Sequence, residues 1–156
     1  MTVTAPSPAP GTIVGVTGSV AGKAGGSPDG TAGGKLGGSA RRALGKAGED
    51  LAVAWYEARG YEVLARNWSC RDGELDLVLR RDRLHVFCEV KARSSGAFGL
   101  PAEAVGPLKQ ARVRRLAALW FADLSRTGRG GRAGGPVRFD VASVLEGEVA
   151  VIEGAF

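Results

Sequence analysis

The sequence predicts an α/β domain in which a mixed β-sheet is flanked by helices, preceded by a disordered N-terminal tail. Two segments repeat apolar residues at three- and four-residue spacing, which is typical of amphipathic helices. Five shorter segments rich in Val, Leu and aromatic residues are typical of strands. The order of these segments is αβββαββ, and a meander followed by a crossover helix implies a sheet with antiparallel and parallel pairs.

The predicted tail is residues 1–40 and the predicted domain is residues 41–156. The tail consists almost entirely of Gly, Ala, Ser, Thr, Pro and Val, with no aromatic residue and almost no charge. Such a segment cannot bury enough apolar surface to offset its ordering entropy, so disorder is expected. Its short apolar run, TIVGV, follows no basic start, so it is not expected to be a signal peptide.

The first half of the domain is predicted to hold one helix and three strands. Apolar residues of the helical spacing run through 39–60, which ends at a glycine. The strands are expected over 61–68, 75–79 and 84–92, and the Arg71–Gly73 segment is expected to form the first turn.

The second half of the domain is predicted to hold a helix and two strands. Residues 94–106 read as a loop with one helical turn, and the helix follows over 107–124, beginning at a proline. The basic, glycine-rich segment 125–136 is expected to be a flexible loop. Strands are expected over 137–145 and 149–154.

The charge, the cysteine and histidine content and the apolar segments limit the classes of protein to which the sequence can belong. The formal charge is +5 and the sequence pI is about 9.7, which permits a nucleic-acid partner without requiring one. The two cysteines form no CxxC pair and there is one histidine, so a structural zinc site is not expected. No segment is long and apolar enough to span a membrane, so no membrane partner is expected, and the unpaired cysteines favour a cytoplasmic location.

Charged residues inside two adjacent strands form the candidate site. Side chains alternate between the faces of a strand, so Glu89 and Lys91 lie on one face. Asp76, on the preceding strand, shares that face if the hairpin loop has two or four residues, for instance if Leu79 pairs with Leu84. A three-residue loop would instead place Asp76 on the opposite face.

The residue types in this cluster suit a magnesium site. Two neighbouring carboxylates repel one another unless a hard cation lies between them, and Mg²⁺ prefers one or two carboxylates together with phosphate oxygens. A lysine two residues from Glu89 can reach the same phosphate or orient an attacking water. An exposed strand face carrying ordinary ion pairs is the alternative, because acid-x-Lys alone is a weak motif.

Further short motifs are spread over residues 45–141. They are Gly45-Lys46-Ala47-Gly48-Glu49, Gly60-Tyr61, Asn67, Gly73-Glu74-Leu75-Asp76-Leu77, Val86-Phe87-Cys88-Glu89-Val90-Lys91-Ala92-Arg93, Gly99, Pro101, Glu103-Ala104-Val105, Lys109 and Arg138-Phe139-Asp140-Val141. Together they resemble the YraN-like family of bacterial proteins, endonuclease-like members of the PD-(D/E)xK nuclease superfamily. Two departures are mild: Cys88 replaces the usual aliphatic residue and Leu75 a common isoleucine.

The resemblance implies a restriction-endonuclease-like αβββαβ core and a metal-dependent nuclease that hydrolyses phosphodiester bonds. It implies that Asp76 and Glu89 bind Mg²⁺ or Mn²⁺, with Lys91 as the superfamily's lysine and Glu49 as an additional helix acid. Glu49 and the Val90 carbonyl are expected to complete the metal ligands. The expected partner is nucleic acid, with DNA favoured and branched or processed DNA as candidate substrates; a junction substrate would favour a homodimer.

Two other functions stay open at this point. A non-catalytic nucleic-acid-binding module with the same fold would bind branched or single-stranded DNA without cleaving it. An interaction protein whose glycine-rich tail docks elsewhere is the third hypothesis. Clustered acids argue against both, because a protein that only binds phosphate gains nothing from negative charge at the binding site.

Several basic residues are candidates for contact with nucleic acid. Lys109, near the start of the second helix, is expected to contact an anion or an acid on the sheet, or else to extend to solvent. Arg93 continues the face that carries Glu89. Arg112 belongs to a set of helix and loop arginines that either contacts phosphates or is ordinary solvated charge. Arg138 and Asp140 are expected to support the edge of the sheet and to pair with other charges.

Overall fold

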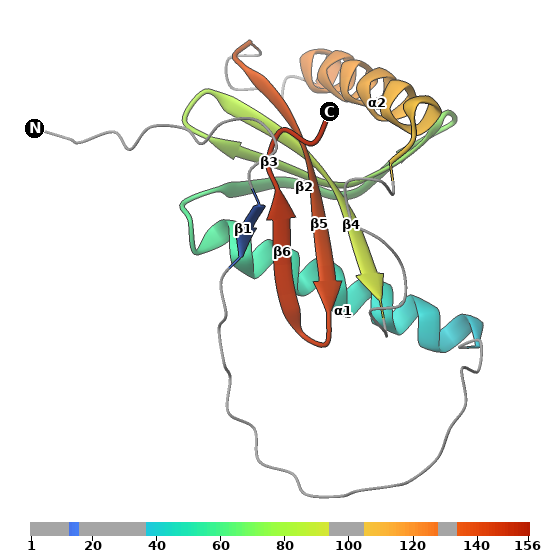
Figure 1. The fold of residues 1–156 in the computed structure, drawn as a ribbon. Coiled ribbons are helices and arrows are strands. Elements are labelled where there is room, and N and C mark those ends of the chain that lie inside the picture. Colours follow the sequence, from blue (N-terminus) through green and yellow to red (C-terminus); the bar gives the residue numbers. More distant parts are fainter. Residues whose placement is uncertain (1–12, 16–36, 94–104, 128–133) are drawn as a thin grey trace, which may run out of the picture.

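The computed structural model describes residues 13–15, 37–93, 105–127 and 134–156, which form one six-stranded sheet with a helix on each face (Figure 1). The elements are β1 (Ile13–Gly15), α1 (Gly38–Glu57), β2 (Glu62–Cys70), β3 (Gly73–Arg81), β4 (Leu84–Arg93), α2 (Pro107–Thr127), β5 (Val137–Leu145) and β6 (Glu148–Ile152).

The strand order in the sheet is β1-β6-β5-β4-β3-β2. The strands β2, β3 and β4 form an antiparallel meander, and β5 pairs with β4 in parallel after the crossover through α2. A final antiparallel hairpin joins β5 to β6. The predicted mixed sheet flanked by helices and its αβββαβ core are therefore confirmed. Neither helix in the described parts of the chain is long and apolar enough to cross a membrane.

The structure differs from the sequence prediction at the N-terminal side. Ile13–Gly15, which composition assigned to a disordered tail, pairs antiparallel with β6 as the strand β1. The helix α1 begins at Gly38, three residues before the predicted start of the domain. A three-residue strand contributes little by itself, so its place depends on the open edge of β6. The rest of the tail, residues 1–12 and 16–36, and most of the loop expected at 94–106 lie outside the described residues.

The hairpin between β3 and β4 has a two-residue loop. Arg81 pairs with Leu84, so Asp82 and Arg83 form the turn, and Asp82 takes a left-handed conformation (φ 55°). Leu79 consequently pairs with Val86 rather than with Leu84. This register differs by two residues from a pairing of Leu79 with Leu84, and an even shift leaves every side chain on its expected face.

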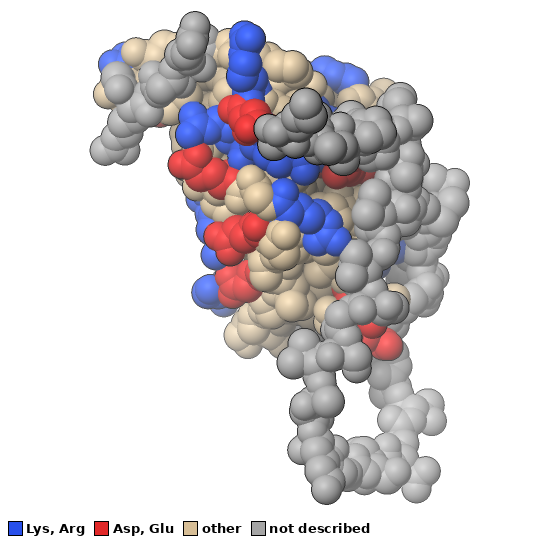
Figure 2. Space-filling view, turned by 90° about the vertical axis from the view of Figure 1, so that its left-hand side faces the viewer, with Lys and Arg blue, Asp and Glu red and all other residues tan. Residues whose placement is uncertain are grey.

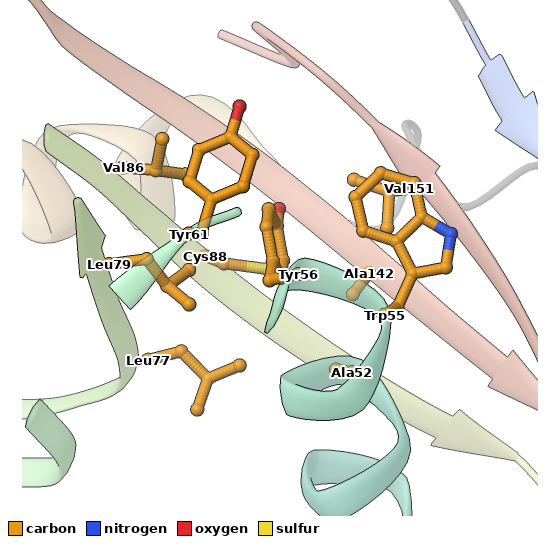
Figure 3. Packing of buried hydrophobic residues seen from close by; sticks show 10 residues of the cluster. All are labelled: Ala52, Trp55, Tyr56, Tyr61, Leu77, Leu79, Val86, Cys88, Ala142 and Val151. Atoms are coloured by element: carbon orange, nitrogen blue, oxygen red, sulfur yellow. The ribbon is translucent and has the colours of Figure 1, made fainter. Parts of the chain in front are cut away.

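Two apolar cores lie on opposite faces of the sheet. The core on the α1 side contains Trp55 and Tyr56 from the helix, packed on strand residues such as Leu77 and Val86 (Figure 3). The core on the α2 side contains strand residues of the opposite parity, such as Phe87, packed under helix residues. These helix residues are Val113, Leu116, Ala117 and Trp120. Because each face is covered by its own helix, a charged residue beneath a helix is partly or wholly shielded from solvent.

Gly48 allows α1 to approach the sheet closely. A Cβ at Gly48 would lie 2.6 Å from the Cβ of Ala92 on β4, whereas a Cβ at Gly45, one turn earlier, would meet nothing within 4 Å. We expect Gly48→Ala to lower the free energy of unfolding by about 1–3 kcal/mol through overpacking. The matched variant Gly45→Ala should raise it by about 0.5–1 kcal/mol through helix propensity. Urea denaturation of both variants measures the difference, and an equal response at the two positions would contradict the close approach.

Candidate metal centre

The acids of the predicted cluster lie next to one another on the α2 side of the sheet. Leu77 on β3 pairs with Cys88 on β4, so Asp76 and Glu89 are the next residues across the hairpin. The Oδ2 atom of Asp76 accepts a hydrogen bond from the backbone N–H of Val90 at 2.8 Å. This bond fixes one oxygen of Asp76 against the β4 backbone and leaves the other for a further partner.

Two lysines share a single oxygen of Glu89. Lys91 donates from Nζ to Glu89 Oε1 at 2.6 Å, and Lys109 of α2 donates to the same oxygen. The Glu89 side chain is 12% exposed, whereas Lys91 and Lys109 are 28% and 38% exposed. Of the alternatives for Lys109, contact with an acid on the sheet is therefore the one observed, and α2 supplies a cation to the site.

The two carboxyls differ in their protonation behaviour. Burial, together with the charge of Glu89, raises the pKa of Asp76 from its usual 3.8 to about 6, against the opposing effects of the Val90 hydrogen bond and the two lysines. Burial also acts to raise the pKa of Glu89, but the hydrogen bonds from Lys109 and Lys91 outweigh it and the pKa is lowered. The pKa of Lys91 is raised, because its bonds to Glu89 outweigh its burial, so its ammonium stays charged at neutral pH.

This donor set fits a hard divalent cation better than zinc. The charge on Asp76 is held unfavourably beside Glu89, which is the arrangement that a cation between two carboxylates relieves. Within the described ranges no three His, Cys, Asp or Glu side chains gather as a metal cluster. Oxygen donors from two carboxylates, supplemented by backbone carbonyl, water and phosphate oxygens, match the preference of Mg²⁺.

Glu49 is held by β2. Its Oε2 accepts a hydrogen bond from Asn67 Nδ2 at 2.8 Å and lies 3.8 Å from Arg66 Nη2. Asn67 has positive φ (48°), a conformation that asparagine tolerates better than most residues. The sequence predicts no role for Asn67. Its residue type, in a strand whose neighbours are mostly apolar or basic, was the available signal.

The two arginine candidates occupy different positions. Arg93 is the last residue of β4, on the same face as Glu89 and Lys91 by strand parity. Arg112 lies one turn after Lys109 on α2, and its guanidinium sits so close to Gly73 that a Cβ there would collide with it. Gly73 has positive φ (144°) and begins β3, so Arg112 covers the turn that precedes Asp76.

Arg138 and Asp140 form a buried ion pair in the interior of the sheet. The prediction that they support a sheet edge is wrong because β5 lies between β4 and β6, whereas the expected pairing with charges is confirmed. Asp140 is fully buried and accepts hydrogen bonds from Arg138 Nε (2.9 Å) and Nη2 (2.8 Å), from Tyr56 Oη (2.7 Å) and from Gly154 N (2.9 Å). Arg138 also donates to Glu153 Oε2 at 3.0 Å. Since the buried polar groups of this network have hydrogen-bond partners, the network is structural and links α1 to β5 and to the segment after β6.

Comparison with known proteins locates the chain among its relatives. A sequence model of the family described as "Uncharacterised protein family UPF0102" matches residues 48–144. A UPF0102 protein of Beutenbergia cavernae is 54% identical over 106 residues, covering 68% of this chain and 85% of the relative. A UPF0102 protein of Frankia casuarinae is 49% identical over 122 residues, covering 75% and 98%. A UPF0102 protein of Acidothermus cellulolyticus is 42% identical over 127 residues, covering 76% and 96%.

The matched region runs from α1 to β5 and contains all four side chains of the candidate metal centre, Asp76, Glu89, Lys91 and Lys109. The chain therefore belongs to the UPF0102 family, the YraN-like family that its motifs indicated.

Proposed function

We propose that the protein is a metal-dependent nuclease that hydrolyses phosphodiester bonds in nucleic acid, with DNA as the favoured substrate. The observation that carries the proposal is the pair Asp76 and Glu89, two half-enclosed carboxylates with lysines beside them. The ionised form of Asp76 is less favourable in the folded chain than in water, since its pKa is raised to about 6. Strongly shifted pKa values of this kind are common in active sites.

Each residue has a distinct part in the proposed reaction. Asp76 and Glu89 would hold Mg²⁺ or Mn²⁺, with the Val90 carbonyl as a further ligand. When bound, the ion would neutralise charge on the phosphate and lower the pKa of a bound water. Lys91 stays protonated, so it would orient that water and stabilise developing negative charge rather than remove a proton. Glu49 is proposed as an outer acid, because its carboxylate is already bonded to Asn67.

Cleavage assays with the full chain test the proposal. Labelled duplex, single-stranded, flapped and four-way-junction DNA, and RNA, would each be incubated with Mg²⁺ or Mn²⁺. We expect cleavage of at least one substrate and a loss of about 10²–10⁴-fold in Asp76→Asn and in Lys91→Met. Glu62→Gln, which removes an exposed acid on β2, is the matched control and should keep full activity. Metal-dependent cleavage that survives in Asp76→Asn would come from a contaminant and reject the assignment. Tight binding without cleavage would favour the binding-module hypothesis.

Removal of Lys109 is expected to tighten metal binding. Its ammonium is bonded to the Glu89 carboxylate that would also hold a bound cation. We expect Lys109→Met to lower the Kd for Mn²⁺ about fivefold, the equivalent of about 1 kcal/mol for a partly exposed ion pair. Isothermal titration calorimetry with Mn²⁺ at pH 7.5 measures the change without any substrate. Arg112→Met removes a charge one turn further along α2 and should leave the Kd within about twofold. Weaker binding by Lys109→Met than by Arg112→Met would reject competition for Glu89.

A further inference from the structure

A solvent-open groove lies between the turn joining β2 to β3 and the C-terminal half of α2. Its volume is about 440 Å³, within the range of small-ligand sites. Half-buried apolar side chains line it from both elements, and charged side chains border it. The lining includes Trp68, Cys70, Leu119, Arg71, Asp123 and Arg126. None of these residues belongs to the candidate metal centre.

The helix α2 connects this groove to the metal centre. Lys109 contacts Glu89, Arg112 covers Gly73, and Arg115 pairs with Asp72 at 3.0 Å, each three residues after the last. Residues at this spacing lie on one side of a helix. Arg126 follows within the same helix and borders the groove. From Lys109 to Arg126 the axial distance is about 25 Å at 1.5 Å per residue.

The basic side chains along this path remain available to an anion. Arg71 and Arg112 have no ion pair within the described ranges. Arg115 and Arg126 pair with Asp72 and Asp123, but their side chains are 68% and 78% exposed. Exposed pairs of this kind contribute little stability, and a guanidinium has five donors, so phosphates can compete for them.

Charged side chains of both signs also gather on the described surface (Figure 2). On the face in Figure 2, acidic and basic side chains are interleaved over most of the described surface. The α2 path combines cations, two of which pair with Asp72 and Asp123, with a groove that contains one aromatic side chain, Trp68, half-buried against the α2-side core. Proteins hold single strands with such a combination, because cations follow the backbone and an aromatic side chain contacts a base.

We propose that this groove binds one unpaired nucleobase of a single-stranded segment of the substrate. The row Lys109, Arg112 and Arg115 would follow the phosphates between that base and the scissile bond at Asp76. The base must be unpaired because its faces and edges are enclosed in a duplex. The inference rests on the proposed nuclease function and assigns the substrate class: a duplex with a single-stranded arm. A path of about 25 Å corresponds to about seven nucleotides at 3.4 Å each, and to fewer in an extended strand.

The test is binding of armed duplexes to the full chain in EDTA, measured by fluorescence anisotropy. The duplexes carry single-stranded arms of 0, 2, 4, 6, 8 or 12 nucleotides. We expect affinity to rise about tenfold with arm length and to level off between about four and eight nucleotides. Arg71→Ser/Arg126→Ser should lose this gain. Arg41→Ser/Arg83→Ser removes the same charge from α1 and the β3–β4 turn, and should keep the gain. Equal losses in the two double variants, or no gain in the parent chain, would overturn the proposal.

Photocrosslinking locates the contact independently of these variants. An arm with 5-iodouracil at successive positions should crosslink to the Trp68–Asp72 segment at one or two adjacent positions, and peptide mapping identifies the segment. Crosslinks found only in other segments would overturn the proposed contact in the groove.

Cleavage in Mg²⁺ or Mn²⁺, with Asp76→Asn as control, separates this inference from the proposed function. Arm-dependent binding without cleavage would support the groove and reject the nuclease, whereas cleavage without arm dependence would retain the nuclease and reject the groove.

Discussion

Asp76→Asn is expected to stabilise the fold at pH 7.5 by about 3 kcal/mol. The pKa of Asp76 is about 6 in the folded chain against a usual 3.8, so between these values the folded state binds more protons than the unfolded state. The free energy of unfolding therefore falls as pH rises through this window, and above pH 6 the full penalty of about 2.2 × 1.36 kcal/mol is present. An amide avoids this penalty, and its oxygen can still accept the hydrogen bond from Val90.

Urea denaturation in EDTA at pH 7.5 and pH 4 measures this effect. The gain should be present at pH 7.5 and nearly absent at pH 4, where the Asp76 carboxyl of the parent chain is protonated. Glu89→Gln is the matched variant and should have the opposite sign at pH 7.5, because Lys91 and Lys109 lose their shared anionic partner. If both variants changed stability in the same direction, the unequal environments of the two acids would be refuted. In the expected pattern, the Asp76 side chain lowers the stability of the fold but is needed for the proposed activity.

Arg138→Met is expected to destabilise the fold by about 3–5 kcal/mol. It would leave the fully buried Asp140 without its cation, and an unpaired buried carboxylate is costly. Since a domain of this size is stable by about 5–15 kcal/mol in total, the loss should shift the unfolding midpoint strongly. Chemical denaturation at pH 7.5 measures it.

The matched control is Arg80→Met, which removes the arginine of the exposed pair with Glu62 (2.6 Å) on the neighbouring strands. It should cost less than about 1 kcal/mol. The double variant Arg138→Met/Asp140→Leu should recover part of the loss, because no unpaired charge remains buried. A cost of less than 1 kcal/mol for Arg138→Met would show that water or another cation reaches Asp140.

The local sequence was sufficient to predict the elements and the faces of their side chains. Apolar periodicity placed both helices within a few residues, and strand alternation put Asp76, Glu89 and Lys91 on one face. The assignment of Asp76 to the face of Glu89 and Lys91 required only that the hairpin loop have an even number of residues. The sequence left loops of two and of four residues open, since the segment Arg80–Arg83 contains no glycine to mark a two-residue turn. The structure has the two-residue loop, in which Asp82 adopts the left-handed conformation.

Contacts that depend on long-range packing could not be predicted in the same way. The neighbours of β5 follow from the strand order, which no local pattern encodes. Arg138 and Asp140 were therefore expected at a sheet edge, although they lie in its interior and Asp140 is fully buried. The sharing of Glu89 Oε1 by two lysines depends on where α2 crosses the sheet. The catalytic roles of these residues stay predictions until cleavage is measured.

The two outer strands of the sheet protect it from pairing with other chains in different ways. At one margin, Ile13–Gly15 occupies the outer hydrogen-bonding side of β6. At the other margin, β2 is irregular: its pairing with β3 shifts between Val63 and Ala65, and Asn67 departs from strand conformation. Bulges of this kind make an edge a poor template for another strand. One margin is thus shielded by its own irregularity, whereas the other depends on a distant three-residue segment, whose loss would open β6 to association between copies of the chain.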